Sequence, residues 1–107
     1  MSTSNTATLS LRSVLEEDKL NGTNFLDWFR NLRIVLKQER KAYALDQLIL
    51  EEPVANAPRA QKDDYTKHHN DSMDVGCLML ATMVPKLQKD LEHMEALKMI
   101  VYLKEMF

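Results

Sequence analysis

The stretch Phe25-Leu26-Asp27-Trp28-Phe29-Arg30-Asn31-Leu32-Arg33-Ile34-Val35-Leu36 decides the fold of this protein. At about 100° per residue, its large apolar side chains fall on one face about 120° wide. That face consists of Phe25, Trp28, Phe29, Leu32, Val35 and Leu36. The pattern predicts an amphipathic helix from Phe25 to about Lys41, with Ile34 on the opposite side. Asn21-Gly22 predicts a turn before this helix, and Thr23 or Asn24 can cap its first turn.

A long second helix is predicted after a loop that contains Pro53 and Pro58. Two prolines so close together exclude helix between them, and Pro58 suits the start of the next helix. We expect this helix to run from about Arg59 to Met83, before Pro85. Its predicted buried face consists of Tyr65, His69, Met73, Gly76, Leu80 and Met83. Ser72 and Gly76 are small, so another helix could approach them closely.

Shorter apolar segments predict the remaining elements. Residues 9–15 form either a helix of about two turns or an extended arm. Residues 43–47 can form one more helical turn, and residues 86–93 a short helix or turn. A last helix at 95–107 has two apolar sides, one formed by Ala96, Leu97, Ile100, Leu103 and Phe107 and the other by Met99 and Met106.

Length and composition favour a helical protein with one core. The chain has 107 residues, which is room for one domain, and its two Gly and three Pro are few for the many turns of a sheet protein. We therefore predict an all-α fold, a compact orthogonal bundle of about five helices. The bundle would occupy residues 9–107 as a single domain, behind a disordered polar tail at residues 1–8.

Charge and apolar content limit the classes of function. The 14 basic and 16 acidic residues give a formal net charge of -2, whereas a chain built only to hold nucleic acid is usually basic. Residues 1–8 lack the basic start and apolar run of a signal peptide. The longest apolar stretch, at 77–81, is far below the roughly 20 residues of a membrane helix. We expect a cytoplasmic protein without membrane contact.

The sequence contains no pattern of residues that predicts catalysis or metal binding. Cys77, the single cysteine, lies in an apolar run, where we expect a packed core thiol rather than a nucleophile. His68 and His69 would point about 100° apart on a helix, so they cannot hold one metal together. The only glycines are Gly22 and Gly76, so there is no Gly-rich phosphate loop. We expect no enzyme, no metal, no cofactor and no small-molecule substrate.

Several motifs resemble those of Gag proteins from plant copia-type LTR retrotransposons. The first is Lys19-Leu20-Asn21-Gly22-Thr23-Asn24-Phe25-Leu26-Asp27-Trp28, in which a leucine, a Gly-containing turn, an aromatic residue and a Trp follow one another. The segments 30–37, 52–60, 77–83 and 103–107 resemble the same family, in the same order and with natural spacing. The resemblance covers about residues 11–107. Its core signature consists of Leu20, Gly22, Phe25, Trp28, Leu32 and Leu36.

The resemblance implies the N-terminal capsid domain of a Gag polyprotein. Copies of such a domain self-associate and bind other Gag chains in virus-like particles. In these polyproteins a second capsid domain and a zinc knuckle follow. A zinc knuckle needs three Cys and one His, and this chain has one Cys. We therefore expect retrotransposon RNA to be bound through downstream regions that this chain lacks.

The candidate contacts for assembly lie outside the predicted core faces. Apolar candidates for self-assembly are Ile34, Met99 and Met106. Weak candidates for RNA contact form the basic side of the first long helix, because phosphates favour such stripes; they are Arg30, Arg33, Lys37, Arg40 and Lys41. Two alternatives stay open: a truncated or host-adopted Gag fragment acting as a protein-interaction domain, and a weak RNA-binding module.

Overall fold

The computed structural model describes residues 12–48 and 51–107. Within these ranges the chain is all-helical and contains no strand, which confirms the predicted fold class. The elements are the helical residues 12–17, α2 (Phe25–Gln38), the 3-10 helix η1 (Ala42–Leu45), α3 (Arg59–Ala81), α4 (Pro85–Leu91) and α5 (Ala96–Met106). The predicted disordered tail, 1–8, and the first three residues of the segment 9–15 lie outside the described residues, and the rest of that segment is helical.

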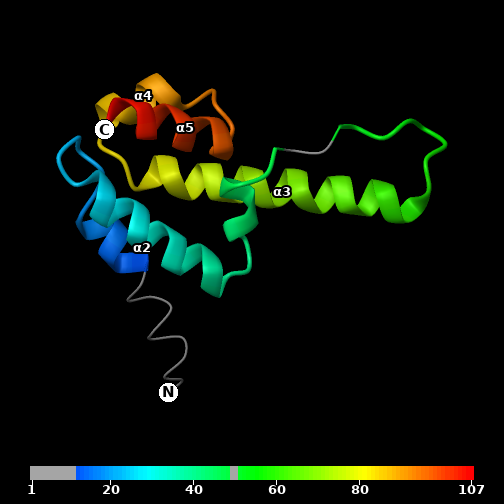
Figure 1. Ribbon diagram of the computed structural model, residues 1–107, viewed down its shortest axis with the longest axis horizontal. Coiled ribbons are helices and arrows are strands. Elements are labelled where there is room, and N and C mark those ends of the chain that lie inside the picture. The colour runs from blue at the N-terminus through cyan, green and yellow to red at the C-terminus, as the bar shows by residue number, and fades with distance from the viewer. Residues whose placement is uncertain (1–11, 49–50) are drawn as a thin grey trace, which may run out of the picture.

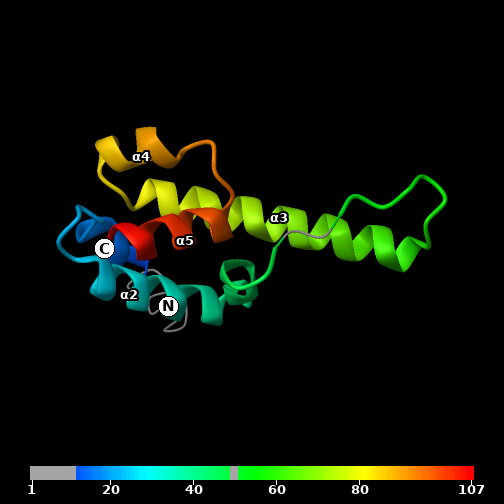
Figure 2. The same cartoon turned by 45° about the horizontal axis from the view of Figure 1, so that its top comes forward.

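The longest helix, α3, is the axis on which the others assemble. It contacts α5, η1 and α4, and η1 also contacts α5 and α2. Around the second half of α3 lie α2, α4 and α5 (Figure 1). Figure 2 shows the same arrangement from another angle, with the first half of α3 and the loop 51–58 extending away from the other helices. The bundle is therefore concentrated at one end of α3.

The buried face of α2 is the one that the sequence predicts. Trp28 is 1% exposed and Leu32 is 0% exposed, while Phe29 is half-buried at the edge. The helix ends at Gln38 rather than near Lys41, because Arg40 adopts a left-handed conformation with a φ of 61°. The N–H of Lys41 donates to Leu36 O at 2.8 Å and that of Arg40 to Lys37 O at 3.1 Å. This is the pattern of a Schellman cap.

The buried face of α3 differs from the predicted one. The structure buries His68, Ser72, Val75, Gly76 and Met79. In contrast, His69 is exposed and Met73 is 56% exposed, so their predicted burial is wrong. Most of the error is a shift of one residue, which corresponds to about 100° around the helix. Apolar residues surround the second half of α3, so contacts with η1 and α5 decide which face is covered.

A helix packs closely against Gly76, as the sequence predicts for this small residue. A methyl group placed on Gly76 would lie 3.3 Å from Cε of Met99 and 4.0 Å from the backbone N of Ala96. Both residues belong to α5, which therefore crosses α3 at this point. Ser72, one turn earlier, is 4% exposed.

Two distant parts of the chain pair beside the C-terminal end of α3. The N–H of Leu20 donates to Thr82 O at 2.9 Å, and the N–H of Val84 donates to Leu20 O at 3.0 Å. These bonds form a single parallel bridge between Leu20 and Met83, whose side chains are both 0% exposed. The bridge fixes the chain just before α2 to the link between α3 and α4.

Candidate self-association surface

The signature that begins at Leu20 builds the turn that leads into α2. Gly22 has a φ of 99°, a left-handed value that favours glycine. The Asn21 side-chain oxygen accepts hydrogen bonds from the Thr23 N–H at 3.0 Å and from its hydroxyl at 2.8 Å. The Asn24 side chain accepts from the Asn21 N–H at 3.1 Å and donates to Lys19 O at 2.9 Å. These residues hold the turn in shape, which gives each of them a structural role.

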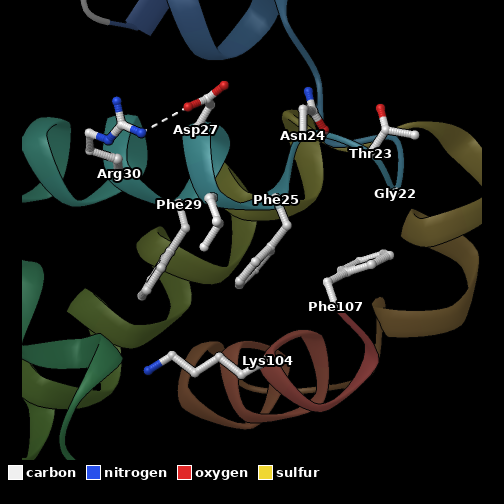
Figure 3. Close-up of a pocket in the computed structure, with 10 residues that line it drawn as sticks. Gly22, Thr23, Asn24, Phe25, Asp27, Phe29, Arg30, Lys104 and Phe107 are labelled. Atoms are coloured by element: carbon white, nitrogen blue, oxygen red, sulfur yellow. Dashed lines mark hydrogen bonds and ion pairs between the residues drawn. The ribbon is translucent and has the colours of Figure 1, made fainter.

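A groove lined by three phenylalanines, here named the aromatic groove, lies between the start of α2 and the end of α5. Figure 3 shows Phe25 and Phe29 pointing from α2 toward α5, with Phe107 facing them. The Phe25 ring stacks on Phe29 with centroids 5.5 Å apart and lies 5.8 Å from Phe107. The groove has a volume of about 730 Å³, and its other lining residues are Gly22, Thr23, Asn24, Leu26, Asp27, Arg30 and Lys104.

Two cations lie against the ring of Phe29, and one of them, Lys104, lines the aromatic groove. The Lys104 ammonium is 5.1 Å from the centroid of the Phe29 ring, and the Arg33 guanidinium is 5.7 Å from it. Both distances allow cation–π attraction. Arg30 instead donates to the Asp27 carboxylate at 2.8 Å, the contact drawn in Figure 3. A groove of apolar rings with a lysine ammonium beside them suits an apolar or acidic side chain of a partner.

The basic stretch that runs along α2 and on to Lys41 is partly paired with carboxylates. Three of its five candidate RNA contacts form ion pairs, namely Arg30 with Asp27 at 2.8 Å, Arg33 with Asp46 at 3.6 Å and Lys41 with Asp74 at 3.0 Å. The other two, Lys37 and Arg40, are exposed. The pairing lowers the positive charge that this side offers to phosphate.

Two of the three predicted self-assembly contacts are exposed. Ile34 is 44% exposed on α2, and Met106 is 42% exposed on α5. Met99 is 0% exposed, so the prediction that it contacts a partner is wrong. It lies on the inward face of α5 with Ile100 and Leu103, where its methyl end packs toward Gly76.

An apolar groove on the outer side of α5, here named the α5 face, was not found by sequence reasoning. It has a volume of about 470 Å³ and is lined by Leu48, Met94, Leu97, Lys98, Val101, Tyr102 and Glu105. Leu48, Val101 and Tyr102 are 63%, 48% and 39% exposed. The available signal was that α5 carries apolar residues on more than one side, which is typical of a helix covered on several faces.

A hydrogen-bonded cluster fixes η1 to α3. The Tyr43 hydroxyl donates to the Asp71 carboxylate, and the Lys67 ammonium lies 2.7 Å from the same oxygen. Burial raises the pKa of Tyr43, and its bond to Asp71 adds to that effect. Burial opposes ionisation of Asp71, but hydrogen bonds from Lys67 and Tyr43 outweigh it and lower the pKa of that carboxyl. The bond to Asp71 raises the pKa of Lys67. The cluster is an ion pair with a bound neutral phenol, and its role is structural.

The residues considered for metal or thiol chemistry lie in different settings. Cys77 is exposed, so its predicted place in the core is wrong. It follows Gly76, which faces α5, and therefore points away from that contact. His68 is 5% exposed and its ring centroid lies 5.1 Å from that of Tyr43. In residues 12–48 and 51–107, no group of three or more His, Cys, Asp or Glu side chains could hold a metal.

In the described part of the chain, no helix combines the length and the apolar character that crossing a bilayer requires.

Comparison with known proteins adds no relative. No family model, no curated protein and no solved structure matches the chain, so the Gag resemblance rests on its own sequence motifs.

Proposed function

We propose that this chain is the N-terminal capsid domain of a copia-type retrotransposon Gag protein and acts by self-association, without catalysis. The observation that carries the proposal is the α5 face. Leu48, Val101 and Tyr102 are exposed neighbours in one groove rather than scattered single residues. Contiguous exposed apolar surface of this kind indicates a protein partner.

The residues of the Gag-like signature have linked structural roles in this fold. Leu20 pairs with Met83, Gly22 forms a left-handed turn, and Trp28 is buried against Thr82. These residues depend on one another, because the turn positions the helix that carries Trp28. The signature on which the resemblance rests is therefore one structural unit of this fold.

The proposed mechanism is multivalent assembly. Val101 on the α5 face, Ile34 on α2 and Met106 near the end of α5 give each copy several exposed apolar contacts. Each contact is weak, but many closed contacts in a ring or shell add up to a stable particle. Weak contacts also let a wrongly placed copy dissociate.

Sedimentation velocity over a wide concentration range, with negative-stain microscopy of the most concentrated sample, tests the proposal. We expect a reversible rise in mass, with rings or shells at high concentration. Co-expression with a longer copia-type Gag is the second arm, in which we expect the chain to enter the particles. Exclusion from those particles together with a monomer at every concentration would reject the proposed function.

The aromatic groove favours a second candidate function, a protein-interaction domain that takes an apolar or acidic segment of another Gag chain. Its rings and the Lys104 ammonium form a surface that differs from the α5 face. The variant Leu26→Asp changes a groove residue that is 76% exposed and so leaves the core intact. If this candidate holds, the chain lowers the particle yield of a co-expressed full-length Gag, and Leu26→Asp relieves that effect. An unchanged particle yield would count against it.

A further inference from the structure

We infer that two copies of this chain pair through the α5 face around a two-fold axis, with their α5 helices antiparallel and Lys98 of each copy against Glu105 of the other. The inference rests on the proposed self-association and specifies which surface begins it and in what geometry. The occupant of the apolar groove is thus a second copy of the same chain.

The centre of the α5 face is apolar. Val101 and Tyr102 lie in the middle of α5 and are 48% and 39% exposed, and Leu97 and Met94 continue the apolar surface at one end. Leu48, which precedes α3 in the chain, adds an exposed side chain at the edge. Tyrosine supplies a large apolar area at a small cost in side-chain entropy, so it is frequent in protein interfaces.

The charges of the α5 face are arranged symmetrically about this apolar centre. Lys98 and Glu105 both line the groove, and they are seven residues apart in the sequence. Seven residues are about two helical turns, or about 10.5 Å, so both side chains lie on nearly the same side of α5. The midpoint between them falls between Val101 and Tyr102.

This symmetry selects the antiparallel arrangement. If two α5 helices cross at the midpoint in opposite directions, each Lys98 meets a Glu105 and each Val101 meets a Tyr102. A parallel pair would instead place Lys98 against Lys98 and Glu105 against Glu105, which is repulsive. A two-fold interface requires a surface that is complementary to itself, and the α5 face meets this condition in charge.

Lys98 is available for such a contact. Its side chain is 68% exposed, and its ion pair with Glu95 in the same helix has an N–O distance of 3.6 Å. Exposed pairs of this type contribute little to stability. A partner's Glu105 can therefore share the ammonium without loss of the helix.

The dissociation constant of the full chain, measured by sedimentation velocity, tests the pairing. Val101→Asp would place a charge at the apolar centre and should raise the dissociation constant about tenfold or more. Lys98→Glu alone and Glu105→Lys alone should each raise it about tenfold, because every two-fold pair contains the contact twice. The double variant Lys98→Glu with Glu105→Lys restores opposite charges and should return to about the wild-type value.

Controls separate the interface from the stability of the monomer. Lys86→Glu makes the same charge change on α4, away from the α5 face, and should leave the dissociation constant unchanged. Far-UV circular dichroism checks that each variant is folded. The double variant loses the ion pair between Lys98 and Glu95 in the monomer and in the dimer alike. This loss therefore does not affect the dissociation constant.

The outcomes distinguish this inference from the proposed function. Self-association that is insensitive to Val101→Asp, or a double variant as weak as the single ones, overturns the α5 pairing and leaves self-association standing. A wild-type chain that stays monomeric at all concentrations also overturns the pairing. The proposed function itself fails only if that monomer is in addition excluded from particles of a longer Gag.

Discussion

The indole N–H of Trp28 donates a hydrogen bond to the Thr82 hydroxyl oxygen at 3.1 Å, which joins α2 to the end of α3 across 54 residues of sequence. Both side chains are buried, at 1% and 0% exposure. The Thr82 hydroxyl lies 2.9 Å from Leu78 O, to which it can donate its own proton. The contact lies beside the bridge between Leu20 and Met83, so α2 is held to this end of α3 at two adjacent points.

Replacing Trp28 should strongly destabilise the fold. Trp28→Ala should cost about 3–5 kcal/mol of unfolding free energy, since it leaves a large cavity. Trp28→Phe retains most of the apolar volume and should cost less, about 1–2 kcal/mol, mainly for the lost hydrogen bond. Urea unfolding followed by circular dichroism measures both, because Trp28 is the single Trp and fluorescence would be lost.

The partner residue gives the control for this hydrogen bond. Thr82→Val removes the acceptor but keeps the side-chain shape, and it should cost about 1–3 kcal/mol because the indole N–H stays buried without a partner. The double variant, Thr82→Val with Trp28→Phe, should lose about 1 kcal/mol less unfolding free energy than the sum of the losses in the two single variants. Simple additivity would show that the bond contributes nothing to stability.

The turn before α2 should require glycine at position 22. Gly22→Ala should lower the unfolding free energy by about 1–2 kcal/mol, because alanine is strained at a φ of 99°. The added Cβ itself fits, since it would lie 3.6 Å from the Phe107 ring. Gly22→Asn should be milder, because asparagine tolerates left-handed conformations. Equal losses for both variants in thermal melts would point to a cause other than backbone strain.

Removing the polar ring of His68 should stabilise the protein. Its Nε2 is buried, and no hydrogen-bond partner for it exists in the described ranges. His68→Phe keeps an aromatic ring beside Tyr43, 5.1 Å from the present ring, and removes an unsatisfied polar atom. We expect a gain of about 1 kcal/mol in chemical denaturation. A loss of stability in that variant would contradict this prediction.

The ionised form of Asp71 should contribute stability that depends on pH. Its pKa is lower in the folded state than in the unfolded chain, so its contribution is present above about pH 4 and is lost as pH falls through the folded-state pKa. Asp71→Asn should cost about 1 kcal/mol at neutral pH and reduce the loss of stability in acid. Asp64→Asn, on the same helix but exposed, is the matched control and should change neither quantity. If the unfolding free energies of wild type and Asp71→Asn fall by the same amount as the pH is lowered, this role of Asp71 is contradicted.

The sequence alone was sufficient for the buried face of α2 and for the end of the loop at Pro58. Along α2 the large apolar residues follow one helical period and the other side is polar, so only one face can be buried without loss. The structure buries Trp28, Leu32 and Leu36 on that face. The chemistry of Gly22 likewise predicted a turn, because few residues tolerate its backbone conformation.

The tertiary structure alone decided what α3 and α5 expose. Apolar residues surround the second half of α3 and most of α5, so their sequences allow several buried faces of similar energy. The contact of α5 with Gly76 resolves both cases: it buries Met99 on one helix and leaves Cys77 exposed on the other. The same contact turns Val101 and Tyr102 outward and so creates the α5 face. When one side of a helix is polar, the local sequence period determines which face is buried. When apolar residues lie on every side, long-range packing determines it.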